Sequence, residues 1–268
     1  MRALFPRLGV AVLIGLVAFA VFGPLINLVI WAFAEQWFFP NRLPSQWGFM
    51  FWERVFRPRA GAWEALGNSV GIALATVVFS MALAIPAGYA LARLVLPFRH
   101  LIMLVFLLPQ AFPSLPIFVN IAAMFYGLGL NGTYFGVILV HSLPGLVYAV
   151  WIATAAFAAT DIAMEEAARN LGASPLRTFR DITLPQAAPG LMAASIFVFL
   201  DSIDEFTGTF FVGTPDITTL PILMFNAAMG GNYQIAAITA LILLIPSVGF
   251  MLIIERFLKS DVLARIGR

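Results

Sequence analysis

The chain has 268 residues, of which 62% are apolar and 10% are charged, and its formal net charge is +2. A soluble domain carries about 25% charged residues, so this composition excludes a water-soluble protein and indicates an integral membrane protein of one domain. The lack of cysteine excludes disulfides and thiolate metal sites. The basic residues are spread over the loops and give no surface for nucleic acid.

Six apolar segments are long enough to cross a bilayer, which takes roughly 20 helical residues. They are about 9–33, 68–92, 101–125, 132–158, 188–212 and 235–258. None alternates strictly between apolar and polar residues, so we predict helices rather than barrel strands. We expect residues 1–64 to form a first helix and an outer loop, 65–258 a core of five helices, and 259–268 a tail. The first segment is too long for a cleaved signal peptide, so we interpret it as a retained helix.

The distribution of Lys and Arg orients these spans. Of the 15 Lys and Arg residues, Arg42, Arg54, Arg57 and Arg59 lie in the loop after the first span, and the rest fall on the other side. This asymmetry predicts that both termini and residues 161–185 are cytoplasmic. The outer loop also carries four tryptophans, which indicate a helix at the membrane surface or a contact with a partner protein.

Residues 161–185 form a polar, charged segment between two apolar spans, and we call them the coupling segment. Thr160 or Asp161 can cap a helix that Gly172 ends. Ser174 can cap a second short helix that begins at Pro175, and we expect Pro185 to close the segment. Its apolar side chains suit docking into a groove of another protein; they are Leu171, Leu176, Phe179, Ile182 and Leu184.

The spacing Glu166-Ala167-Ala168, Gly172, Ile182 and Leu184-Pro185 resembles the EAA loop of ATP-binding-cassette (ABC) importer permeases. That loop reads Glu-Ala-Ala, three residues, Gly, nine residues, Ile, one residue, Leu-Pro. Residues 65–258 resemble the type I, binding-protein-dependent, MetI-like permeases. The resemblance implies an all-α fold of six transmembrane helices with a cytoplasmic coupling helix that contacts an ATPase. The implied coupling positions are Glu165, Glu166, Ala167, Ala168, Gly172, Ala173, Ser174, Pro175, Ile182, Leu184 and Pro185.

The chain lacks the Gly-x-x-x-x-Gly-Lys-Ser/Thr loop that binds ATP phosphates. We therefore expect a transport subunit without catalytic residues, metal or cofactor of its own. The resemblance implies a second, different permease subunit, two ATPase subunits that bind ATP and Mg, and a periplasmic solute-binding protein. It also implies location in the bacterial inner membrane, in contact with lipid.

The fifth span contains three acids, Asp201, Asp204 and Glu205. Their i, i+3 and i+4 spacing places all three on one helix face. A charge at mid-membrane costs about 2.5–3.5 kcal/mol, so such a cluster must face water, bind a cation, pair with a partner subunit or be partly protonated. We expect either a path for a cationic solute, or a wet vestibule or a hydrogen-bond network between subunits.

Aromatic residues on the fourth span could add to this path. His141, Tyr148 and Trp151 share one helix face, where they could form a wall for a cation or simply pack between helices. Three prolines interrupt the third span, as a gate or as a fixed kink; they are Pro109, Pro113 and Pro116.

Residues 202–206, Ser-Ile-Asp-Glu-Phe, and Thr-Leu-Pro at 219–221 resemble the spermidine/putrescine permease group. This implies a polyamine solute, with iron(III), an opine or aminoethylphosphonate as alternatives. A proton-coupled secondary transporter that uses the acids as a relay is a different possibility. An intramembrane aspartyl protease needs aspartates on facing helices, whereas here the acids share one span.

Overall fold

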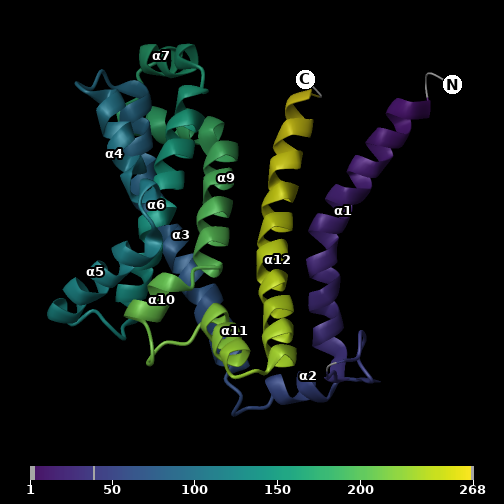
Figure 1. Cartoon of the computed structure of the whole chain (residues 1–268). Coiled ribbons are helices and arrows are strands. Elements are labelled where there is room, and N and C mark those ends of the chain that lie inside the picture. The colour runs from purple at the N-terminus through teal and green to yellow at the C-terminus, as the bar shows by residue number, and fades with distance from the viewer. Residues whose placement is uncertain (1–3, 39, 267–268) are drawn as a thin grey trace. The chain divides into compact units, whose positions relative to one another are not determined.

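The computed structural model describes residues 4–38 and 40–266, which fold almost entirely into helices (Figure 1). The elements are α1 (Leu4–Phe33), β1 (Ala34–Gln36), β2 (Gln46–Trp47), α2 (Met50–Val55), α3 (Ala62–Arg93), α4 (Arg99–Ala111), α5 (Ser114–Leu128), α6 (Tyr134–Ala158), α7 (Ile162–Asn170), α8 (Pro175–Thr178), the π-helix η1 (Phe179–Thr183), α9 (Leu184–Ile203), α10 (Thr207–Val212), α11 (Leu220–Met229) and α12 (Tyr233–Ile266).

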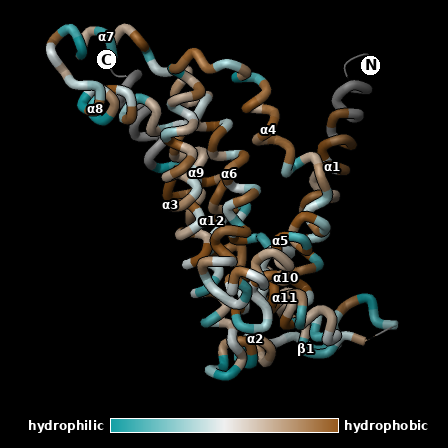
Figure 2. Tube along the Cα trace, turned by 90° about the vertical axis from the view of Figure 1, so that its left-hand side faces the viewer, coloured by the Kyte–Doolittle hydropathy of each residue, from teal (hydrophilic) through white to brown (hydrophobic). Residues whose placement is uncertain are grey.

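The helical membrane fold predicted from composition is confirmed. Within the described residues, five segments are long and apolar enough to span a bilayer: Val12–Phe33, Ala62–Arg93, Tyr134–Ala158, Pro175–Ile203 and Tyr233–Arg256. The pair α4 and α5 would make a sixth span, bent by 95°. Hydrophobic residues run along α6 and α9, whereas hydrophilic residues gather at α7 and α8 (Figure 2).

The third predicted span, 101–125, is not one straight helix. It divides into α4 and α5 at Phe112, which is extended (φ −104°, ψ 149°) and precedes Pro113. The ring of a proline disfavours helical conformation in the residue before it, which explains why the break falls here. The prediction that prolines interrupt this span is therefore confirmed. Pro116 lies in the first turn of α5, where its missing N–H has no intrahelical acceptor to lose.

The fifth span begins and ends at other residues than the predicted bounds of 188 and 212. Helical backbone runs without a gap from Pro175 through η1 into α9, so the second short helix is the first turn of a long one, and Pro185 does not close the segment. The π-turn explains this, because the N–H of Leu184 bonds to the carbonyl of Phe179, five residues back, and the shifted ladder accommodates the proline. At the other end, α9 stops at Ile203.

The chain divides into two compact units, Met1–Ala65 with Leu220–Leu244, and Leu66–Thr219 with Ile245–Arg268. In the first unit, β1 and β2 form a two-stranded antiparallel ribbon before the six-residue helix α2. The ring of Trp31 lies 4.4 Å from that of Trp37, and Glu35 accepts a hydrogen bond from the Met50 N–H at 3.0 Å. A membrane-surface position for α2 stays a prediction, as does the division at residues 64/65 and 258/259.

The second unit is built on the close packing of α3, α6 and α9 (Figure 1). Small residues allow it: a Cβ at Gly88 would lie 2.7 Å from the Ala153 Cβ, and one at Gly190 would overlap Ala156. The buried core here comprises Met81, Ala84, Leu91, Ala149, Val150, Ala153, Phe157, Ala187, Leu191, Ala194 and Val198. A second cluster joins α5, α6 and α10 around Phe118, Val140 and Val212.

Candidate functional site

The coupling segment begins with the predicted caps. The Asp161 carboxylate accepts a hydrogen bond from the Ala163 N–H at 2.9 Å and starts α7. The Ser174 hydroxyl accepts one from the Arg177 N–H at 3.3 Å, with Pro175 as the first residue of α8. Both side chains satisfy backbone donors that a helix N-terminus leaves open, which confirms the two start points.

Gly172 ends α7 in the way its position predicts. Its φ is +87°, and its N–H donates to the carbonyl of Arg169 at 2.9 Å. The next N–H, of Ala173, donates to the carbonyl of Ala168 at 3.0 Å. These two bonds make a Schellman turn, which a left-handed residue is required to close. Both α7 and α8 lie at one end of the second unit (Figure 2).

The apolar side chains of the coupling segment do not all face outward, as docking would require. Leu171 is 90% exposed and Leu176 is 77% exposed. Phe179 is partly buried instead, with its ring 5.0 Å from Tyr89 and 6.0 Å from Phe157. Ile182 and Leu184 are also partly buried. Of these five side chains, Leu171 and Leu176 are therefore the two that are largely exposed.

Glu165 is another correction, because its side chain is turned inward. It is 2% exposed, and Oε1 lies 2.9 Å from Nη2 of Arg93 at the end of α3. Arg169 approaches the other carboxylate oxygen at 3.4 Å. The side chain of Glu165 is therefore covered by residues of this chain, whereas that of its neighbour Glu166 is exposed.

The remaining coupling positions divide by exposure. Ala167, Gly172, Ser174, Pro175 and Pro185 are exposed, and Ala168 and Ala173 are partly covered.

Sequence reasoning missed Arg93, which also donates from Nη2 to the Thr160 carbonyl at 3.1 Å and to the Thr160 hydroxyl. Its only signal was a basic residue that ends an apolar span.

A small cavity of about 170 Å³ lies where two broken spans meet. Gln110, Phe112 and Ser114 line it at the α4–α5 bend, and Asp201 and Glu205 line it at the end of α9. A helix break inside a membrane leaves backbone groups without intrahelical partners, so it is tolerated where it faces protein or a polar cavity. The two breaks thus gather carboxylates, an amide and a hydroxyl at one place.

The three acids are not arranged as predicted, because the helix that would align them ends at Ile203. Asp201 lies in the last turn of α9, and its Oδ2 is buried without a hydrogen-bond partner. Asp204 follows the last residue of α9, is exposed and does not line the cavity. Glu205 accepts a hydrogen bond from the Gly208 N–H at 2.7 Å, in the first turn of α10. The described residues hold no group of three acids or histidines that could bind a metal ion.

The predicted aromatic wall on α6 is also not formed. His141 is 1% exposed and lies in the packing between helices. Its Nδ1 is 2.8 Å from the Ser202 hydroxyl, and its Nε2 is 2.7 Å from the Thr209 hydroxyl. Tyr148 instead stacks against Phe197 at 6.3 Å, and Trp151 is partly buried with its indole nitrogen unpaired. His141 therefore connects α6 to both sides of the α9–α10 break.

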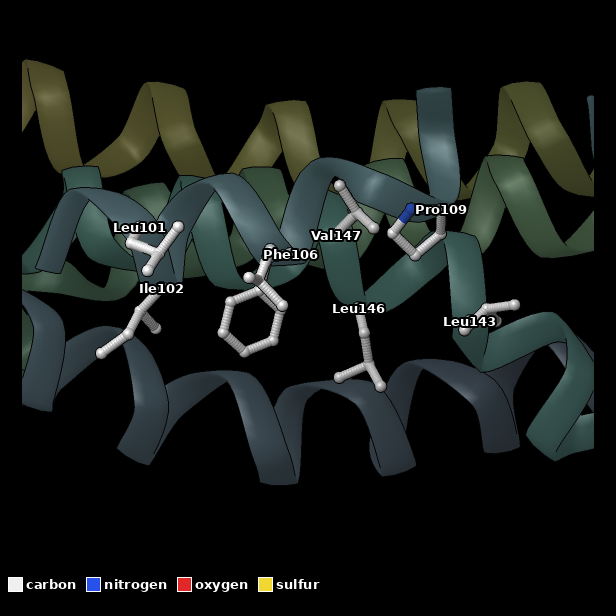
Figure 3. A pocket seen from close by; sticks show the side chains of 8 residues that line it. Leu101, Ile102, Phe106, Pro109, Leu143, Leu146 and Val147 are labelled. Atoms are coloured by element: carbon white, nitrogen blue, oxygen red, sulfur yellow. The ribbon is translucent and has the colours of Figure 1, made fainter. Parts of the chain in front are cut away.

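An apolar pocket of about 360 Å³ lies between α4 and α6 (Figure 3). Its lining residues are Leu101, Ile102, Val105, Phe106, Pro109, Leu143, Leu146 and Val147. These residues offer no polar side chain to a hydrophilic solute.

Residues 84–261 match the family of binding-protein-dependent transport system inner membrane components. The chain belongs to this family. It is 32% identical over 220 residues to the trehalose transport system permease protein SugB of Mycobacterium tuberculosis, with 80% of each chain covered. It is 28% identical over 240 residues to the putative 2-aminoethylphosphonate transport system permease protein PhnV of Salmonella typhimurium, with 89% of each chain covered.

Solved structures show the same fold. A bacterial ABC transporter involved in import of the acidic polysaccharide alginate superposes with a TM-score of 0.71 at 18% identity, over 95% of this chain and 96% of that one. The MetNI methionine ABC transporter gives 0.57 at 16% identity, over 75% and 94%. The chain is therefore a multi-pass permease subunit of a bacterial ABC importer, not the ATPase. These relatives do not support the narrower resemblance to spermidine/putrescine permeases.

Proposed function

We propose that this chain and a second, different permease subunit form the path of an ATP-driven importer for a small solute with a protonated amine. In this proposal the coupling segment docks on an ATPase subunit that binds ATP and Mg. A periplasmic binding protein delivers the solute from the other side, and both termini of this chain lie in the cytoplasm. The alginate transporter solved in complex with a substrate-bound periplasmic protein shares the fold, which is consistent with such an assembly.

The shape of the coupling segment supports ATPase docking. Leu171 and Leu176 stand out on either side of the Gly172 turn, and Arg177 beside them is also exposed. Exposed leucines at a polar end of a membrane protein gain by burial in a partner groove, at about 1.5–3 kcal/mol for each side chain. The unit is small, rigidly capped and held by a Schellman turn, so little conformational freedom is lost on docking.

The observation that carries the solute class is the pair of carboxylates in the cavity. Asp201 and Glu205 both line it, and no lysine or arginine is among the lining residues. Asp201 also has one buried oxygen without a partner. A carboxylate removed from water needs a cation or a hydrogen-bond donor, and a protonated amine supplies both. A solute that carries only negative charge would be repelled here.

Within the amine class, the relatives favour 2-aminoethylphosphonate over a polyamine. Its ammonium group could lie against Asp201 and Glu205, with the phosphonate directed away from them. A polyamine also fits the acidic cavity, but the relatives named above do not support it. Trehalose has no charge, and a trehalose importer would not need two carboxylates without a basic partner.

The test is uptake by the reconstituted complex of labelled 2-aminoethylphosphonate, spermidine and trehalose, each measured separately. We expect Asp201→Asn and Glu205→Gln to lower amine uptake about 10- to 100-fold, the range for a lost hydrogen bond to a charged group. Both amides keep the shape of the acid, and Gln at 205 can still accept the Gly208 N–H. Asp204→Asn is the matched control and should have a smaller effect. Transport of trehalose alone, or full amine uptake in both amide variants, would overturn the amine proposal.

A further inference from the structure

The coupling segment is joined through the backbone to α6 and α9, and two of its side chains also fasten it to α3. Glu165 of α7 pairs with Arg93, and Phe179 of η1 lies edge-on to Tyr89 at 5.0 Å. Tyr89 and Arg93 are four residues apart, so they share one face of the last turns of α3. Two independent contacts, one ionic and one aromatic, therefore end on the same short stretch of helix.

The ionic contact is nearly sealed from water. Arg93 donates from Nη2 at 2.9 Å and from Nε at 3.2 Å to the same Glu165 oxygen, and the two side chains are 10% and 2% exposed. Moving α7 away from α3 would leave Glu165 with only the longer contact to Arg169, and Arg93 with only the uncharged Thr160 oxygens. Separating a buried ion pair in this way is strongly unfavourable. The contact should therefore be either fully formed or fully broken.

The helix that receives this contact is itself rigidly held. Gly88, five residues before Arg93, packs against the backbone of Thr154 and the Cβ of Ala153. Leu91, between the two contact residues, is buried in the core cluster with α6 and α9. Close-packed interiors move as bodies and transmit strain rather than absorbing it. A displacement of α7 would therefore pass into α3.

We infer that the Arg93–Glu165 pair is a mechanical link between α7 of the coupling segment and α3, and that it makes these two helices move as one body. Arg93 and Glu165 are positioning residues, and the exposed Glu166 and Leu171 are left to meet the ATPase. The inference rests on the proposed ATPase docking and is independent of the solute.

Because the chain has no cysteine, a pair of spin labels can report the link directly. Leu83→Cys places one label on an exposed position of α3, and Ala163→Cys places the other on the exposed side of α7. Double electron–electron resonance then measures the distance between the labels in the assembled complex, without nucleotide and with ATP. With the native pair we expect the same distance in both states. In Glu165→Gln we expect a shift of roughly 2 Å or more on ATP binding, the scale of helix displacements in such transitions.

Three further variants make the test specific. Arg169→Gln removes the half-exposed partner of the same carboxylate and should leave the distance fixed. Arg93→Lys keeps a charge but loses the two-nitrogen contact, so it should give a smaller shift. Arg93→Glu with Glu165→Arg, in the Arg169→Gln background, should restore the fixed distance.

A fixed distance in Glu165→Gln and in Arg93→Lys would overturn the link. So would a native distance that changes with ATP, or an exchanged pair that restores nothing. Co-purification of the ATPase subunits is measured first, because a native chain that fails to retain them overturns the docking proposal and the link together. Retention of the ATPase with a fixed distance in both Glu165→Gln and Arg93→Lys overturns the link alone.

Discussion

Nε2 of His141 in α6 lies 2.7 Å from the hydroxyl of Thr209 in α10, while Nδ1 lies 2.8 Å from the hydroxyl of Ser202 in α9. One imidazole therefore spans the break that carries Asp201 and Glu205. The Thr209 hydroxyl also donates to the Glu205 carbonyl at 3.3 Å. The placement of the two cavity acids thus depends on a histidine that does not line the cavity.

Replacing this histidine with leucine should destabilise the protein. His141→Leu leaves the buried Ser202 hydroxyl without a partner and removes one of the two bonds of the Thr209 hydroxyl. The change should cost about 1–3 kcal/mol and lower the thermal unfolding midpoint of the purified chain. Adding Ser202→Ala and Thr209→Val removes both hydroxyls and should recover most of the loss. Tyr148→Leu is the control, because it removes a ring from the exposed side of α6. It should lower stability by about 1 kcal/mol or less. No recovery in the triple variant would contradict the hydroxyl account.

Gly208 is predicted to tolerate no side chain while Val140 faces it. A Cβ at Gly208 would overlap the Val140 Cγ1, so Gly208→Ala should push α10 away from α6 and cost about 1–3 kcal/mol. It should also lower amine uptake, because the Gly208 N–H holds Glu205. Val140→Ala added to Gly208→Ala should restore both stability and uptake.

The control for this position is Gly71→Ala. Gly71 also lies in a helix, but a Cβ added there would have no neighbouring atom within 4 Å. Alanine there should be neutral or stabilising by up to about 1 kcal/mol. Thermal unfolding and uptake of the variants give the comparison, and equal effects at the two glycines would contradict the packing argument.

Gly172 is predicted to be needed for its backbone conformation alone. Its Cβ direction is open, but its φ of +87° is unfavourable for alanine by about 1–2 kcal/mol. Gly172→Ala should loosen the Schellman turn and reduce ATPase retention on purification. Gly172→Asn should be milder, since asparagine adopts left-handed conformations more readily. Gly67→Ala, at an open position within α3, serves as control, and identical retention in all three variants would refute the requirement.

Leu171 and Leu176 are predicted to bind the ATPase without contributing to folding. Because both are exposed, serine at either position should change stability by no more than about 0.5 kcal/mol. Each change should weaken ATPase association about 10- to 100-fold, as expected from losing roughly 1.5–3 kcal/mol of apolar burial. Titration of detergent-purified permease with ATPase measures this. Val95→Ser, at a fully exposed residue in the turn after α3, should bind normally.

Local features were predictable from local residues. Asp161, Gly172 and Ser174 act within four residues of where they stand, through caps and a turn that depend only on neighbouring backbone groups. The break at Phe112 was also visible in principle, because it follows from the proline after it. The long apolar runs indicated spans because the hydrocarbon core of a bilayer admits little else.

The break after Ile203 was not predicted. Three acids interrupt the apolar residues between 201 and 205, but apolar residues return up to Val212, and we interpreted 188–212 as one span. The interruption is stabilised from outside: His141, 61 residues from Ser202 and 68 from Thr209, bonds both sides of it, and Val140 packs on Gly208. Periodicity along one helix cannot register a partner on another, so the predicted acidic stripe was wrong.

The sequence by itself determined that this chain is a helical membrane protein, where its coupling segment starts and turns, and which family it resembles. Only the tertiary structure decided that Glu165 faces Arg93, 72 residues away, while Glu166 faces outward. It likewise decided which acids share a cavity. Burial and ion pairing depend on how α3, α6 and α9 pack, and that packing is a property of the whole bundle rather than of any one segment.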